Sequence, residues 1–221
     1  MAKKEILVSI TGTSDPDWQN KFEEIKNLNI KRFALFLERF TPLQRRRIYK
    51  ELIELKIKNI PLIHIRNDMK KSELIFLIKN FNPEFMTIHE STFEYGYLKK
   101  WNGFYRKLFL ELNFDNHLSK KVDVKKVGGF CIDLSHYKAS EIRNTKEFEY
   151  LIKNKNLVKC NHLNGFSFET CFDVHRIKSL EEFEYLKTIP DLLYGKIIAL
   201  ETENGIREQL RFKEHLKELI P

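Results

Sequence analysis

Residues 129–136 read Gly129-Phe130-Cys131-Ile132-Asp133-Leu134-Ser135-His136, a short apolar run that ends in a carboxylate and is followed by a histidine. Similar runs rich in Ile, Val, Leu and Phe recur along the chain and predict eight strands, near residues 5–11, 32–38, 60–66, 85–90, 107–113, 128–134, 157–163 and 197–202. These runs are almost continuously apolar, which is typical of parallel sheets covered on both faces.

Amphipathic stretches with helical spacing lie between several of these runs: Trp18, Phe22, Ile25 and Leu28; Ile48, Leu52 and Leu55; Phe183, Leu186 and Ile189. Helix-start signals accompany them, with Thr41 before Pro42 and capping-box pairs at Ser91/Glu94 and Ser179/Glu182. Because successive strands start 21 to 40 residues apart, each gap has room for a helix.

Eight strand–helix units predict an α/β fold, a single compact (β/α)8 TIM barrel with short loops that spans residues 1–221 as one domain. A doubly wound open sheet that binds a nucleotide is disfavoured because the chain contains neither GxGxxG nor GxxxxGK[ST].

Acidic and imidazole side chains stand at the carboxyl ends of six consecutive predicted strands: His64, His89, Glu111, Asp133, His162 and Glu201. Side chains alternate along a strand, so all six can point into the barrel, above a layer made by Leu62, Thr87, Phe109, Cys131, Cys160 and Ala199. Three further residues extend the set to nine possible ligands: His136, Asp173 and His175.

Asp, Glu and His number 31 + 7 = 38 of 221 residues, so any one position has about a one-in-six chance of carrying one of them. Six such residues in succession are therefore hard to ascribe to coincidence. A lone inward histidine is more often a hydrogen-bonded core residue, and a lone carboxylate can pair with Lys or Arg. Four carboxylates buried together without cations, however, would repel one another and lose their hydration. We therefore expect a divalent metal. Imidazole and carboxylate ligands fit Zn²⁺, Mn²⁺ or Fe²⁺ better than Ca²⁺, and more than four ligands indicate a multinuclear site.

The overall charge and the cysteines set the wider context. A net charge of +8 suits a polyanionic partner, although a Lys-rich solvated surface accounts for most of it. No leader-like segment and no apolar stretch near 18 residues is visible, so we expect a cytoplasmic protein without membrane association. We also expect it to be a monomer. The three cysteines form no CxxC pair, and we expect Cys131 and Cys160 to fill core volume.

Four of these motifs carry a resemblance to a known superfamily. Residues 129–136, His162-Leu163-Asn164, Asp173-x-His175 and Leu200-Glu201-Thr202 resemble the xylose isomerase-like barrels, over nearly the whole chain. That superfamily includes sugar isomerases and epimerases and the endonuclease IV family of abasic-site DNA repair enzymes.

The resemblance to endonuclease IV implies up to three zinc ions held by His64, His89, Glu111, Asp133, His136, His162, Asp173, His175 and Glu201. It also implies a phosphodiesterase that acts on abasic sites in DNA, in which Glu111 and Glu201 are the catalytic carboxylates and Glu111 bridges two metals. Arg39 and Arg66 are candidate nucleic-acid contacts, and Arg45 to Arg47 are expected on a solvated helix face.

The resemblance to the single-metal sugar isomerases and epimerases leaves an alternative open. In that case Glu111, Asp133, His162 and Glu201 hold one Mn²⁺ or similar ion, and Glu111 and Glu201 exchange a proton on a small sugar or phosphorylated substrate. A non-catalytic barrel that binds nucleic acid through charge alone is a third hypothesis.

Three departures from endonuclease IV bear on DNA recognition. Ile65-Arg66-Asn67-Asp68 follows His64 where that family has a Tyr-Leu pair, Gly165 replaces an Asp, and a Gly-rich stretch after Asp-x-His is absent. Glu38, Glu90 and Glu203 also lie near strand ends, and the sequence assigns them no role.

Overall fold

The computed structural model describes residues 4–89, 99–112 and 126–221. Within them, the main sheet contains nine parallel strands: β1 (Glu5–Leu7), β2 (Ser9–Ile10), β3 (Ala34–Phe36), β4 (Leu62–His64), β5 (Phe85–His89), β6 (Leu108–Leu112), β7 (Gly129–Asp133), β8 (Val158–Leu163) and β11 (Ile197–Leu200). The sheet is nearly closed and barrel-like, because β1 and β2 stand at opposite ends of the strand order although only Val8 separates them in the chain.

Parallel pairing runs around this sheet in the order β1-β11-β8-β7-β6-β5-β4-β3-β2. The predicted first strand is thus interrupted: Glu5 of β1 pairs with Ile197, whereas Ser9 of β2 pairs with Ala34. Val8 contributes to the closure, since its carbonyl accepts a hydrogen bond from the Ala34 amide at 2.9 Å.

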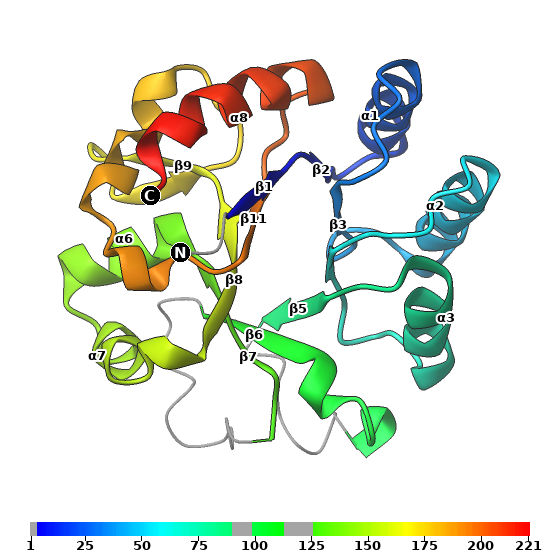
Figure 1. Ribbon diagram of the computed structural model, residues 1–221, viewed down its shortest axis with the longest axis horizontal. Coiled ribbons are helices and arrows are strands. Elements are labelled where there is room, and N and C mark those ends of the chain that lie inside the picture. Colours follow the sequence, from blue (N-terminus) through cyan, green and yellow to red (C-terminus); the bar gives the residue numbers. More distant parts are fainter. Residues whose placement is uncertain (1–3, 90–98, 113–125) are drawn as a thin grey trace.

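Helices surround the strands, as Figure 1 shows with α1 to α3 on one side and α6 to α8 on the other. The α-helices are α1 (Asp15–Asn27), α2 (Pro42–Glu54), α3 (Lys71–Phe81), α6 (Leu134–Arg143), α7 (Lys146–Lys153) and α8 (Ile206–Leu219). Shorter 3₁₀ helices are η2 (Lys99–Trp101), η3 (Tyr105–Lys107), η4 (Lys155–Leu157), η5 (Leu180–Thr188) and η6 (Asp191–Leu193). In the described part of the chain, none of the helices has the length and apolar composition needed to cross a bilayer.

Two of the predicted helix starts can be compared with the structure. Thr41 caps α2, which begins at Pro42, and its hydroxyl accepts from the Gln44 amide at 3.4 Å. Ser179 precedes η5, which is a 3₁₀ helix, and its hydroxyl accepts from the Glu181 amide at 3.3 Å. Among the described residues, no bond between the Glu182 side chain and the Ser179 amide completes the predicted capping box. The Ser91/Glu94 pair lies outside the described residues.

Alternation along each strand separates two apolar clusters. Ile63 and Phe130 point outward and pack in a large cluster that also contains helix residues such as Trp18, Leu52 and Leu74. The alternate positions form a small interior cluster: Leu7, Ala34, Phe36, Leu62, Phe85, Phe109, Cys131, Cys160, Ile197 and Ala199. Five of the six residues predicted to form the inner layer belong to it, and the sixth, Thr87, is fully buried. The layer beneath the strand ends is therefore confirmed.

A small second sheet extends the region after β8. β9 (Gly165–Ser167) and β10 (Phe172–Val174) form an antiparallel pair in which Asp173 lies opposite Phe166. This hairpin was not predicted, and it returns the chain with Asp173 and His175 to the carboxyl ends of the strands.

Candidate metal centre

A cavity of about 340 Å³ opens at the carboxyl ends of the strands. It is lined by Glu38, Arg39, His89, Glu111, Asp133, His136, Asp173, His175 and Glu201. Seven of the nine predicted ligands are among these residues, and the other two, His64 and His162, are buried with no exposed surface. The parallel register explains the convergence, since His89 is paired with Glu111 and Asp133 with His162 on neighbouring strands.

Glu111 lies at the centre of the buried groups. Its Oε2 is 3.2 Å from His64 Nδ1, 3.3 Å from His162 Nδ1 and 3.8 Å from His89 Nδ1. His162 Nδ1 is also 3.3 Å from Oε2 of Glu201, which follows β11 directly. One carboxylate thus touches three imidazoles, and one imidazole touches two carboxylates.

Asp133 connects the centre to helix α6. Its Oδ1 accepts hydrogen bonds from the amides of Ser135 at 2.9 Å and His136 at 3.0 Å, and from the Ser135 hydroxyl at 2.7 Å. This is an N-cap interaction, which holds the carboxylate in one orientation. Its other oxygen, Oδ2, is buried and makes no hydrogen bond within the described residues.

Thr87 orients two of the imidazoles from below. Its hydroxyl oxygen lies 3.1 Å from His64 Nδ1 and 3.1 Å from His162 Nε2. When both of these nitrogens donate to the hydroxyl, the lone pairs of His64 Nε2 and His162 Nδ1 are left available as ligand atoms.

The ligand atoms fall into three overlapping groups in which all atoms lie within 4.8 Å of one another. The groups are Glu38, His64 and His89; His64, Glu111 and His162; and Glu111, Asp133, His162 and Glu201. His136, Asp173 and His175 line the same cavity but are not part of these groups, which were sought among the described residues.

These residues fit a divalent ion on two observations. Five buried atoms that face the groups lack a hydrogen bond among the described residues: His64 Nε2, Glu111 Oε2, Asp133 Oδ2, His162 Nδ1 and Glu201 Oε2. Leaving such an atom unpaired costs about 1–3 kcal/mol, and an ion would satisfy several at once. Ligand bonds of about 2.0–2.1 Å in a tetrahedral site place the ligand atoms about 3.3 Å apart, close to the 3.3 Å that separates His162 Nδ1 from Oε2 of Glu111 and from Oε2 of Glu201.

Burial and charge shift the pKa values of the inner groups. Burial lowers the pKa of His64 to about 4, while the charge of Glu111 raises the pKa of His89 to about 9. Burial opposes the ionisation of Glu111, but His89, His162 and His64 outweigh it and hold the pKa of Glu111 well below its usual value. Burial raises the pKa of Glu201 to about 7.

The outer pair Asp173 and His175 is a salt bridge, with His175 Nε2 at 2.9 Å from Asp173 Oδ2. Its hydrogen bond lowers the pKa of Asp173 to about 2, and against the effect of burial the same bond raises the pKa of His175 to about 10. The other ring nitrogen, Nδ1, lies 3.1 Å from the Glu201 carbonyl oxygen. Protonated imidazoles thus carry positive charge beside the carboxylates, and a divalent ion that bound to these imidazoles would displace their protons.

Lysine and arginine do not neutralise the inner carboxylates. Within the described residues, no Lys or Arg forms an ion pair with Glu111, Asp133 or Glu201. The two arginines predicted to contact nucleic acid differ from each other in their surroundings. Arg39 lines the cavity with its side chain 42% exposed, whereas Arg66 donates to Asp68 at 3.1 Å and to the Glu38 carbonyl.

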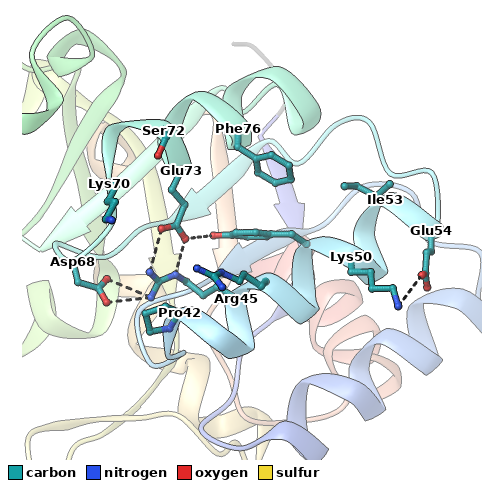
Figure 2. A pocket seen from close by; sticks show the side chains of 12 residues that line it. Pro42, Arg45, Lys50, Ile53, Glu54, Asp68, Lys70, Ser72, Glu73 and Phe76 are labelled. Atoms are coloured by element: carbon teal, nitrogen blue, oxygen red, sulfur yellow. Dashed lines mark hydrogen bonds and ion pairs between the residues drawn. The ribbon is translucent and has the colours of Figure 1, made fainter.

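Arg45 does not lie on a solvated helix face as the sequence suggested. It is 1% exposed, its Nε donates to Glu73 at 2.8 Å, and its guanidinium also pairs with Asp68 (Figure 2). This network lines a groove of about 680 Å³ between α2 and α3, on the outside of the barrel. The groove is larger than the strand-end cavity but contains no group of converging metal ligands among the described residues, so the candidate metal centre lies at the smaller cavity.

Glu38 is the residue of the centre to which the sequence assigned no role. It lies in a turn two residues beyond β3, and its Oε2 is 2.7 Å from His89 Nε2 and 3.6 Å from His64 Nε2. The sequence feature that could have identified Glu38 is its position just after a predicted strand. Glu203 shares that signal but is 3.8 Å from Arg39 and outside the ligand groups, and Glu90 lies outside the described residues.

Comparison with known proteins adds no further constraint on this centre. No protein-family model matches the chain, and no curated protein sequence matches it. The fold and the side-chain geometry are therefore the basis on which a function is inferred.

Proposed function

We propose that this chain is a metal-dependent phosphodiester hydrolase of the endonuclease IV type, which acts on abasic sites in DNA through a multinuclear centre. The observation that supports it is the presence of more than one group of ligand atoms on one cavity floor. The outer group is Glu38, His64 and His89, and the inner group is Glu111, Asp133, His162 and Glu201. A single ion would leave one of them unsatisfied.

The nine residues implied by the resemblance would hold up to three ions, with zinc preferred and Mn²⁺ or Fe²⁺ as other options. Imidazole and carboxylate donors without a thiolate are compatible with all three metals. When bound, such ions polarise a phosphoryl oxygen and lower the pKa of a water molecule. His136, Asp173 and His175 would hold the third ion, separate from the inner and outer groups, where His175 Nε2 and Asp173 Oδ2 already lie 2.9 Å apart.

The protein's own side chains prepare the site for a phosphate. Glu111 is 2% exposed and touches imidazoles of both groups, so it would hold the groups at a fixed separation. Asp133 is fixed by its cap on α6 and Thr87 fixes two rings, which leaves little freedom in the ligand positions. Arg39 lines the open side of the cavity, where its guanidinium can bind a phosphate of the DNA backbone.

We also propose that the sheet is a closed (β/α)8 barrel in which β1 and β2 are two parts of one strand. The single intervening residue, Val8, and its hydrogen bond to Ala34 support this interpretation. In such barrels the functional groups stand at the carboxyl ends of the strands, as the cavity does here.

The direct test is incision of a DNA duplex that carries one abasic site, by protein loaded with zinc. We expect incision at that site. We expect the incision rate of Glu111→Gln to fall by more than the roughly 10–100-fold that substitutions of residues behind the metal ligands cause. Glu203→Gln is the matched control, because Glu203 is a carboxylate near the cavity that belongs to no ligand group. Absence of incision, or equal incision by Glu111→Gln, would overturn the proposal.

A sugar or sugar-phosphate isomerase is the second candidate, because the group Glu111, Asp133, His162 and Glu201 is complete without the outer residues. In that case Glu111 and Glu201, which face His162 Nδ1 at 3.3 Å each, would be the two carboxylates that exchange a proton with the substrate. Elemental analysis separates the candidates, since the isomerase requires one tightly bound ion per chain and the hydrolase requires more.

A further inference from the structure

Glu38 belongs to the outer group of ligand atoms, although the resemblance to endonuclease IV implies no ligand role for it. We propose that Glu38, His64 and His89 hold an ion of their own, and that Glu111 serves the inner group. This inference rests on the metal centre of the proposed function and deepens it.

The geometry of the outer group supports the assignment. Glu38 Oε2 lies 2.7 Å from His89 Nε2 and 3.6 Å from His64 Nε2, so one carboxylate oxygen faces two imidazole nitrogens. His64 Nε2 is completely buried and makes no hydrogen bond within the described residues. Its partner nitrogen, Nδ1, is occupied by Thr87 at 3.1 Å, which leaves Nε2 directed at Glu38.

The surroundings of Glu38 hold its carboxylate in place. Its other oxygen, Oε1, lies 3.4 Å from Arg39 Nε, and its backbone carbonyl accepts from Arg66. The turn that carries Glu38 is closed by the Phe40 amide on the Leu37 carbonyl at 3.2 Å, and the Leu37 amide bonds to the His64 carbonyl at 2.9 Å. The residue before Glu38 is thus bonded to the strand that carries His64.

Assigning Glu38 to the outer ion and Glu111 to the inner group has a chemical consequence. Three protein ligands leave a tetrahedral ion with one open position, which is the pattern of catalytic rather than structural sites. The side chains of Glu38 and His89 are 20% and 30% exposed, whereas that of Glu111 is 3% exposed, so the open position would face the cavity and Arg39. The outer ion would therefore be the one that meets the substrate phosphate.

The test compares metal content in wild type, Glu38→Gln, Glu111→Gln and the control Glu203→Gln, each dialysed against the same buffered zinc concentration. We expect Glu38→Gln to lose one ion, or to bind it at least tenfold more weakly, while the inner group keeps its ion. Glu111→Gln should weaken the inner group and retain the outer ion, and Glu203→Gln should match wild type. Unchanged stoichiometry and affinity in Glu38→Gln would overturn the assignment, as would a wild type without bound ions.

A spectroscopic variant gives an independent answer. With Co²⁺ bound, Glu38→Cys should add a thiolate-to-cobalt charge-transfer band to the wild-type spectrum, and Glu203→Cys should not. A band absent from Co²⁺-loaded Glu38→Cys would count against direct ligation. Loss of one ion in Glu38→Gln, from a protein that does not incise abasic DNA, would support the ligand assignment and overturn the hydrolase, so the two failures are distinguishable.

Discussion

Asp133 uses its two carboxylate oxygens for different purposes. Oδ1 caps helix α6, and Oδ2 faces the inner ligand group with no hydrogen bond from any residue that the structure describes. The cap fixes the side chain at the end of β7, so that local helix formation and ligand placement depend on the same residue.

Two substitutions of Asp133 should separate these purposes. Asp133→Asn retains a capping oxygen, so the free energy of unfolding of the ion-free chain should change little while zinc affinity falls. Asp133→Ala removes both oxygens and should also lower the free energy of unfolding by about 1 kcal/mol. Urea unfolding in the presence of a chelator and zinc titration measure the two effects. Wild-type zinc affinity in both variants would show that Asp133 is not a ligand.

The extent to which single residues could be predicted follows from their position. The six strand-end residues could be read from the sequence because each directly follows a buried apolar run, and the register of parallel strands then brings them together. Glu38 is two residues beyond β3, where the turn and not the strand sets its direction. Arg45 was misplaced because an amphipathic pattern treats arginine as a solvated residue, whereas Glu73 and Asp68 neutralise it inside.

At the scale of elements, Lys21 connects α1 to the segment after β11. It is 3% exposed, and its ammonium group donates to the Thr202 carbonyl at 2.8 Å, next to Glu201. Burial lowers the pKa of Lys21 from 10.5 to about 8. The helix is therefore attached to the cavity side of the barrel-like sheet by a lysine that loses its proton more readily in the folded state.

This predicts a pH dependence of stability. Between about pH 8 and 10.5 the unfolded chain binds a proton at Lys21 that the folded chain has released, so the free energy of unfolding should rise with pH. The gain is at most about 3 kcal/mol. Lys21→Met should abolish this rise in urea unfolding measured across the window, whereas Lys26→Met, an exposed position on the same helix, should keep it. An equal pH dependence in wild type and Lys21→Met would contradict the prediction.

Elements differ in how well the sequence reveals them. The long apolar runs predicted strands where the structure has them. The spacing of Phe183, Leu186 and Ile189 did not distinguish the 3₁₀ helix η5 from an α-helix, because positions three apart share a face in both. The β9–β10 hairpin has only three residues in each strand, too few for a periodic pattern. In the folded structure β9 packs against η5 and β10 against α6, and a local sequence pattern does not record such contacts.

At the scale of the whole molecule, ion binding should contribute to stability, since the ligands come from strands that are far apart in the sequence. Zinc at about a hundredfold above its dissociation constant would add about 2.7 kcal/mol. For a chain of this size, that raises the melting temperature by roughly 5–10 °C over the chelated protein. Scanning calorimetry with zinc, with chelator and with Ca²⁺ measures the difference. Ca²⁺ should give a smaller shift because it prefers oxygen ligands, and a melting temperature insensitive to zinc would count against the centre.

The pairing of β1 with β11 means that the first and last described strands of the sheet support each other, and the Lys4 ammonium group also reaches the Pro221 carbonyl at 2.8 Å. If thermal motion opened that junction, two parallel strand edges would be exposed together, each with unpaired amides and carbonyls. Such edges are templates for pairing with a second molecule. Heating should consequently cause aggregation that begins at the junction, and a covalent link between β1 and β11 should delay turbidity more than one placed between two central strands.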